Sequence, residues 1–477
     1  MLAGTPALIR FFRLKEVFVL IREQNFSKGP IFGRLVRFAL PILLALFLQA
    51  MYGAVDMMVV GQFATAADVS AVSTASWLMH LVTSLVVGIA VGTTVLLGQK
   101  LGEGNAEESG KIIGASIALF ALLGALLTVM MEFLAVPLVT VMQTPPEAVD
   151  AAVDYMRICS AGTIFIVAYN VLGSVFRGIG NSRIPLMAVA FACVFNILGD
   201  YLLVGVFKMA AAGAAIATVA AQALSVLLSF LIIRRQKLPF TFKKCDIKAD
   251  PARMGAVLRL GFPIALQDVL VSISFLAITA IVNTLGVIVS AGVGIAEKLC
   301  GFIMLVPSAF SQAMSAFVAQ NIGAKEPRRA KRGLVYGIAA SLAVGIVIGY
   351  FAFFHGDLLA GIFVSGKDPA VIAAAAEYLK AYAIDCLFTS FLFCLIGYFN
   401  GCGKTTFVMV QGIIGAFGVR VPVSFLMSRR VPVSLFHIGL ATPCSSIVQI
   451  LLCGVYFLLL ARAARRDTWS MESSESI

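Results

Sequence analysis

Apolar residues fill long stretches of this chain, and short segments that contain charge, glycine or proline separate them. Most of these stretches reach the roughly 20 residues that an α-helix needs to cross a bilayer. The pattern therefore predicts an all-α integral membrane protein. We predict twelve membrane-spanning helices, near residues 36–61, 71–98, 110–138, 150–176, 184–207, 211–234, 255–285, 289–320, 333–355, 370–399, 406–428 and 436–462.

The composition agrees with a membrane protein. Of the 477 residues, 60% are hydrophobic and 13% are charged, against roughly 25% charged in ordinary soluble domains. A soluble enzyme is excluded, because its surface would need far more polar residues. The nine cysteines are scattered without a CxxC pair, so we expect neither a metal centre nor a disulfide.

The basic residues are distributed unevenly between the two sides of the membrane. With a cytoplasmic N-terminus, 28 of the 36 Lys and Arg residues fall on the cytoplasmic side and 4 on the outer side. Because Lys and Arg collect in cytoplasmic loops, we expect both termini in the cytoplasm and the chain in a plasma (inner) membrane. The net charge of +12 then reflects topology, and we expect no nucleic-acid partner.

The two halves of the chain repeat each other. LVRFALPILL at 35–44 aligns with VLRLGFPIAL at 257–266, and FRGIG at 176–180 aligns with FNGCG at 399–403. Each half has six spans, an even number, so the halves enter the membrane in the same orientation. We predict two pseudo-symmetric six-helix lobes. The predicted segments are a cytoplasmic N-terminal segment (1–35), an N-terminal lobe (36–234), a basic cytoplasmic linker (235–254), a C-terminal lobe (255–462) and a cytoplasmic tail (463–477).

Two acids inside the predicted N-terminal lobe are candidates for chemistry, since a charge at the bilayer centre costs about 2.5–3.5 kcal/mol on insertion scales. Asp56 lies in the first span and Asp200 in the fifth, where Asn196 precedes it by one turn. Two carboxylates in an apolar bundle cannot both stay ionised without a counter-cation. A bound proton, or Na⁺ held by oxygens that include the Thr218 hydroxyl, would satisfy them. Alternatively, each acid only hydrogen-bonds a neighbouring helix.

The C-terminal lobe offers a comparison for this pair. In the repeat, Asn196 aligns with Val419, Asp200 with Val423 and Asp56 with Ile278. The C-terminal half thus repeats the scaffold motifs but has no acids at these positions. This difference favours a cation site in the N-terminal lobe only.

Other polar residues within the spans are candidates for a substrate cavity: Gln49, Tyr52, Asn170, Asp268, Asp385 and Arg420. For the charged ones, a packing or hydrogen-bonding role is the alternative. Pro41, Pro263 and Pro422 lie inside predicted spans, where proline permits a bend.

Several motifs together resemble the MATE family, the multidrug and toxic compound extrusion transporters. They are VDMMVVGQ in the first span, GQKLGEGN after the second, the turn FRGIGNSRIP, FNILGD followed by GAAIATVAAQ, and QNIGAKEPRRA after the eighth. The resemblance covers about residues 33–462. It implies twelve helices in two lobes, antiport of Na⁺ or H⁺ against organic compounds that are often cationic and lipophilic, and a cation site at Asp56, Asn196, Asp200 and Thr218.

The resemblance also separates two branches of the family. The NorM-like branch has a further acid in the seventh span and another in the tenth. Here those positions are Val271 and Thr389, although Asp268 and Asp385 lie a turn away. The chain therefore resembles the DinF-like pattern more closely.

These observations predict a secondary active efflux transporter that exchanges H⁺ or Na⁺ for organic compounds by rocking of its lobes. It would be a monomer in the lipid bilayer, with no cofactor other than the coupling ion and no enzymatic activity. One alternative is a lipid-linked oligosaccharide flippase, which needs a strongly basic cavity; Lys298 and Arg420 are the basic candidates here. Another is a membrane receptor or scaffold that transports nothing.

Overall fold

The computed structural model describes residues 25–234, 242–362 and 368–474. Predictions for residues 1–24, for residues 235–241 of the linker and for the last three residues of the tail lie outside this range. Every regular element in the described range is helical. The prediction of an all-α membrane protein is confirmed.

The helices of the first half begin directly after Pro30, at the predicted first span. They are α3 (Ile31–Phe63), α4 (Ala66–Gly102), α5 (Ala106–Val141), α6 (Pro146–Ala161), α7 (Thr163–Gly178), α8 (Arg183–Asp200), the π-helix η1 (Tyr201–Val206) and α9 (Ala210–Arg234).

The second half follows after a short 3₁₀ turn, η2 (Lys244–Asp246). Its helices are α10 (Pro251–Asn283), α11 (Val287–Ile303), α12 (Leu305–Gly323), α13 (Pro327–Phe354), α14 (Gly356–Gly361), α15 (Pro369–Gly401), α16 (Thr405–Ile413), the π-helix η3 (Ile414–Arg420), α17 (Val421–Ser428), α18 (Leu435–Gly439) and α19 (Ala441–Ser474).

Eleven of these helices or continuous helix pairs are long and apolar enough to cross a membrane, and the bent pair α6–α7 makes twelve. Each corresponds to one predicted span. The pair bends by 50° next to Gly162, where an added Cβ would lie 2.4 Å from a methyl carbon of Val219 on α9. The sequence prediction considered bends only at prolines, so it missed this one. Pro41 and Pro263 lie inside the uninterrupted helices α3 and α10.

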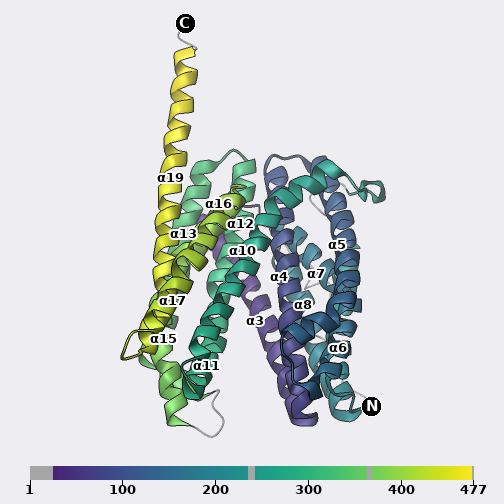
Figure 1. Cartoon of the computed structure of the whole chain (residues 1–477). Helices are drawn as coiled ribbons and strands as arrows, with labels where there is room; N and C mark the ends of the chain where they lie inside the picture. The colour runs from purple at the N-terminus through teal and green to yellow at the C-terminus, as the bar shows by residue number, and fades with distance from the viewer. Residues whose placement is uncertain (1–24, 235–241, 363–367, 475–477) are drawn as a thin grey trace, which may run out of the picture.

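The helices form two lobes that meet at the end of the molecule from which α19 projects and diverge toward the opposite end (Figure 1). We call these the closed end and the open end. The first helix of each half crosses between the lobes. Near the closed end, α3 packs through Phe38 and Ile42 into the core of the second half, whereas Val60 lies in the core of the first half.

Helix α10 makes the reciprocal crossing. Its residues Val257 and Ala265 lie in a core formed by helices of the first half, whereas Ile278 and Val282 lie in the core of the second half. Glycine permits the close approach, because a Cβ at Gly88 of α4 would lie 2.4 Å from the Cα of Ala265. The two crossing helices therefore join the lobes at the closed end.

Two glutamines complete the closed end with equivalent hydrogen bonds. Gln99 at the end of α4 donates from Nε2 to the carbonyl of Gly401 (3.1 Å), and Gln320 at the end of α12 donates to the carbonyl of Gly178 (2.8 Å). Each bond joins one half of the chain to the other. The GQKLGEG segment at 98–104 and the AQNIGAK segment at 319–325 thus carry the same contact in both directions.

Candidate cation site and adjoining cavities

The acids predicted for the N-terminal lobe meet in its open-end half. Asp56 lies on α3, Asn196 and Asp200 lie one turn apart on α8, and Thr218 lies on α9. The side chains of Asp56, Asn196 and Asp200 are 6%, 1% and 0% exposed. Gly199 allows α8 to approach α9, since a Cβ there would lie 3.0 Å from the Cβ of Ala217. The small residues of GAAIATVAAQ thereby bring Thr218 to the acids.

Thr218 links the cluster through its hydroxyl. The Thr218 hydroxyl donates a hydrogen bond to Asp56 Oδ2 (3.2 Å), and Asn196 Nδ2 donates to Thr218 Oγ1 (3.3 Å). Asp56 Oδ1, Asn196 Oδ1 and both carboxyl oxygens of Asp200 are buried without a hydrogen-bond partner within the described residues. Four oxygen acceptors are therefore left for a cation or a proton.

The ionisable side chains of this cluster are both acids. Asp56 and Asp200 interact directly with each other, and neither forms an ion pair with a Lys or Arg in the described part of the chain. Two adjacent buried carboxyls exclude the doubly ionised state unless a positive charge joins them. The donor set, with two carboxylates, an amide oxygen and a hydroxyl, consists of the hard oxygen ligands that Na⁺ prefers.

The backbone changes from α-helix to π-helix at Asp200. Helix α8 ends at Asp200, and the chain continues as the π-helix η1. π-helical turns are rare. Those that occur inside longer helices are often found at functional sites. The second half has the same kind of interruption in its fifth span, where η3 ends at Arg420.

Tyr52 and Gln49 lie closer to the closed end than Asp56 along α3, and Asn170 lies on α7. The Tyr52 hydroxyl accepts a hydrogen bond from Gln222 Nε2 of α9 (3.3 Å). Gln49 and Asn170 line a cavity of about 60 Å³ together with Arg177. Tyr52 does not line this cavity. The structure therefore keeps Gln49 and Asn170 together and separates Tyr52 from them, although the sequence analysis had placed all three in one group.

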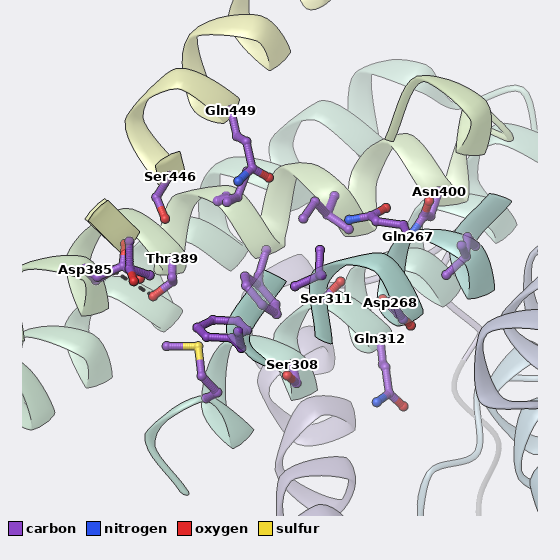
Figure 2. Close-up of a pocket in the computed structure, with 18 of the residues that line it drawn as sticks. Gln267, Asp268, Ser308, Ser311, Gln312, Asp385, Thr389, Asn400, Ser446 and Gln449 are labelled. Atoms are coloured by element: carbon purple, nitrogen blue, oxygen red, sulfur yellow. Dashed lines mark hydrogen bonds between the residues drawn. The ribbon is translucent and has the colours of Figure 1, made fainter. Parts of the chain in front are cut away.

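The charged candidates of the second half line a different, larger cavity of about 280 Å³. Asp268 lies on α10, Asp385 on α15 and Arg420 at the end of η3. Figure 2 shows Asp385 and Asp268 at opposite ends of this group of side chains, with Gln267 and Gln312 near Asp268. Gln312 and Val87 line both cavities, so the two spaces adjoin at α12 and α4.

Several lining residues were missed by the sequence reasoning, which considered mainly charges. They are interior amides and hydroxyls of the second half: Gln267, Ser308, Ser311, Gln312, Asn400, Thr442, Ser446 and Gln449. Polar side chains inside apolar spans were the available signal. Lys298, named as a basic candidate for a flippase cavity, is exposed and does not line the cavity, whereas Arg420 does.

A two-lobed bundle with eleven or twelve spans, buried acids and polar interior cavities defines a multi-pass membrane transporter. The MatE family profile matches residues 41–202 and 263–426, one match in each half. Probable multidrug resistance protein YpnP of Bacillus subtilis is 28% identical over 86% of this chain and 91% of its own length. Probable multidrug resistance protein YoeA of the same species is 27% identical, over 91% and 95%.

Solved structures have the same fold. One is described as the outward-facing conformation of a multidrug resistance MATE family transporter of the MOP superfamily. It superimposes with a TM-score of 0.86 at 18% identity, covering 92% of this chain and 98% of the other. The chain belongs to the MATE family of multidrug efflux transporters, and it is not an enzyme.

Proposed function

We propose that this chain is a secondary active exporter that exchanges H⁺ or Na⁺ for organic cations, by alternating access between its lobes. The coupling site is the cluster of Asp56, Asn196, Asp200 and Thr218. The substrate reaches the two adjoining cavities, lined by Gln49 and Asn170 in one and by Asp268, Asp385 and Arg420 in the other. The related proteins named as multidrug resistance proteins support organic, drug-like substrates.

One observation carries this proposal: two buried carboxyls that interact with each other, together with the Asn196 amide, leave four oxygens unpartnered, and no basic residue of the described chain pairs with them. A purely structural acid pair would have its acceptors satisfied by hydrogen bonds from neighbouring helices. An exchangeable cation explains why these acceptors are open. The absence of acids at Val271 and Thr389 supports the DinF-like pattern, and in this proposal coupling is confined to the N-terminal lobe.

The proposed cycle uses the crossing of α3 between the lobes. Asp56 lies in its open-end half, and Phe38 and Ile42 anchor its closed-end half in the other lobe. Neutralising Asp56 and Asp200 from outside changes the packing of α3, weakens substrate binding and permits return to the inward-facing state. Loss of the ion inside restores the negative charge that attracts an organic cation. Ion and substrate each weaken the other's binding by the same factor.

The proposed topology follows the distribution of charge. With both termini in the cytoplasm, the closed end that contains Gln99 and Gln320 faces the cytoplasm, and the structure represents an outward-facing state. Residues 36–234 and 255–462 then form the two lobes that rock, and a monomer in the plasma (inner) membrane suffices. One basic side chain, Arg420, lines the large cavity, which argues against the pyrophosphate-binding cavity of a flippase.

Counterflow in proteoliposomes tests the proposal. A Na⁺ gradient and a pH gradient are imposed separately while uptake of a fluorescent organic cation is followed. At least one gradient should drive the dye in the wild type. D56N and D200N should abolish the gradient-driven part of transport.

The matched control is D154N, which removes the carboxylate of an exposed acid on α6. This variant should transport as the wild type does. If neither gradient moves the dye, antiport of organic cations is wrong. If D56N and D200N both keep gradient-driven transport, the assignment of the coupling site is wrong.

A further inference from the structure

The large cavity of the second half contains charges that its own side chains leave unpaired. Asp385 and Arg420 are 0% and 6% exposed, and both line the cavity. Their charges interact, yet the two side chains form no direct ion pair. Buried ions normally contact a partner, because removal from water is costly. An unpaired acid and an unpaired base in one cavity therefore indicate a ligand.

Arg420 is held in a fixed orientation. Its Nη1 donates to Ser274 Oγ (3.1 Å), and its guanidinium lies over the ring of Phe275, with 4.4 Å between Cζ and the ring centroid. Nε has no hydrogen-bond partner in the described chain. The guanidinium edge that carries Nε therefore has a buried N–H without an acceptor in the described chain. Such an edge binds a carboxylate through two parallel hydrogen bonds.

Asp385 offers the complementary group. Both of its carboxyl oxygens are buried, and the Ser446 hydroxyl is the one side-chain donor that interacts with them among the residues described. Thr442 Oγ1, which lines the same cavity, is unpartnered in the described chain. These open acceptors fit the three N–H groups of a protonated amine.

Resting on the proposed export function, we propose that this cavity binds the zwitterionic head of an amino-acid-like substrate. The substrate's carboxylate binds the Nε edge of Arg420, and its adjacent ammonium binds Asp385. The four charges then alternate in sign, so each buried ion gains a partner. The body of the substrate extends along the apolar lining, which includes Met304, Leu392 and Phe393, toward Asp268 and Gln312.

This proposal narrows the substrate class. A simple organic cation would satisfy Asp385 and leave Arg420 unpaired, with its positive charge repelling the ligand. A carboxylate beside the amine removes that repulsion. Molecules that carry both groups should therefore bind more tightly than their decarboxylated analogues.

A matched pair of fluorescent probes tests the inference. Nε-dansyl-lysine carries an adjacent amine and carboxylate, and dansylcadaverine is the same molecule without the carboxylate. Binding of each to the purified full-length protein in lipid nanodiscs is followed by dansyl fluorescence. We expect the wild type to bind Nε-dansyl-lysine about tenfold more tightly, the effect of one charge-assisted contact.

Variants assign the preference to the proposed residues. R420Q should abolish the preference while it keeps or improves dansylcadaverine binding, which also shows that the variant is folded. R420K retains the charge without the two-point edge, so its preference should fall without vanishing. D385N should weaken both probes. R430Q, at an exposed arginine, is the matched control and should leave the preference unchanged.

Two results would overturn the inference. One is equal or tighter binding of dansylcadaverine by the wild type. The other is an unchanged preference in whichever Arg420 variant folds. Failure of ion coupling is a separate result, because the probe preference is measured at equilibrium without a gradient. A preference without gradient-driven transport contradicts the proposed antiport alone, and transport without the preference contradicts this inference alone.

Discussion

The two lobes share one scaffold and differ in how they neutralise their buried acids. In the first, Asp56 and Asp200 contact each other with no basic residue of the described chain beside them. In the second, Asp385 interacts with Arg420, a positive charge that is part of the chain. Where the first lobe has Asp56, the second has Ile278 in a hydrophobic core. One lobe needs an exchangeable ion, and the other keeps a tethered positive charge near its acid without a direct ion pair.

This difference suggests a division of labour. A site whose counter-charge can leave responds to ion gradients. A site whose counter-charge is tethered keeps its field through the cycle and suits substrate recognition. Four sets of substitutions test the comparison, from the largest expected effect to the smallest.

The largest effect is expected from removing one acid in each lobe separately. D200N should lower ion-driven transport at least about tenfold, a typical size for coupling between two sites. D385N should change the apparent affinity for substrate and leave the dependence on the ion gradient intact. Initial rates in proteoliposomes, measured over a range of substrate concentrations, distinguish the two. Loss of ion dependence in D385N would contradict the division.

A second test gives the first lobe a tethered cation. Ile197 is the repeat equivalent of Arg420 and lies one turn before Asp200 on α8. I197R should place a guanidinium near Asp200 and replace the exchangeable ion. Substrate binding should then become nearly independent of Na⁺ and pH, where the wild type changes about tenfold. I197Q, of similar polarity without charge, is the control, and an ion dependence retained by I197R counts against the comparison.

A smaller effect is expected at the closed end, which both lobes build alike. A Cβ at Gly323 would lie 1.9 Å from the carbonyl oxygen of Gln99, and one at Gly102 would lie 2.1 Å from that of Gln320. G323A and G102A should each destabilise the closed contact by about 1–3 kcal/mol, the usual cost of overpacking. Labelling of a cysteine introduced at this end should speed up. G454A, where an added Cβ meets no atom within 4 Å, should label as the parent does.

The last test separates the two equivalent glutamines, and the smallest effect is expected at Gln99. Gln320 donates to Gly178 and also accepts from the Phe26 amide (3.2 Å), whereas Gln99 makes the one bond to Gly401. Q320L leaves two buried groups unpartnered and should cost about 1–3 kcal/mol. Q99L should cost about 0.5–1.5 kcal/mol. Thermal unfolding in detergent measures both, and a larger loss for Q99L would contradict the assigned contacts.

Much of the fold could be predicted from the sequence because hydropathy alone identifies membrane-spanning helices. The repeat gave the equivalence of the halves, and the turns at Gly180 and Gly403 have the left-handed φ (+83° and +74°) that favours glycine. The crossing of α3 and α10 could not be predicted. It depends on which apolar faces pack together, and apolar runs do not specify their partners. The bend next to Gly162 depends likewise on one tertiary contact.

The N-terminal cluster was accessible to the sequence because charges inside spans identified Asp56 and Asp200, and Asn196 shares a helix face with Asp200. The Thr218 hydroxyl was a further candidate ligand, and the family resemblance implies the same four residues. The C-terminal cavity was only partly accessible. Charges inside spans identified Asp268, Asp385 and Arg420, but their grouping required the structure. Asp385 and Arg420 lie on different helices, and nothing in the spacing shows that they approach without pairing.

The reciprocal effect of ion and substrate at the N-terminal acids is the central claim. The most direct test is the affinity of the purified protein for a fluorescent organic cation, measured against Na⁺ concentration and against pH. For the wild type, rising Na⁺ or falling pH should weaken dye binding about tenfold, and for D200N the affinity should stay constant. An ion dependence that is equal in D200N and the wild type would contradict the claim.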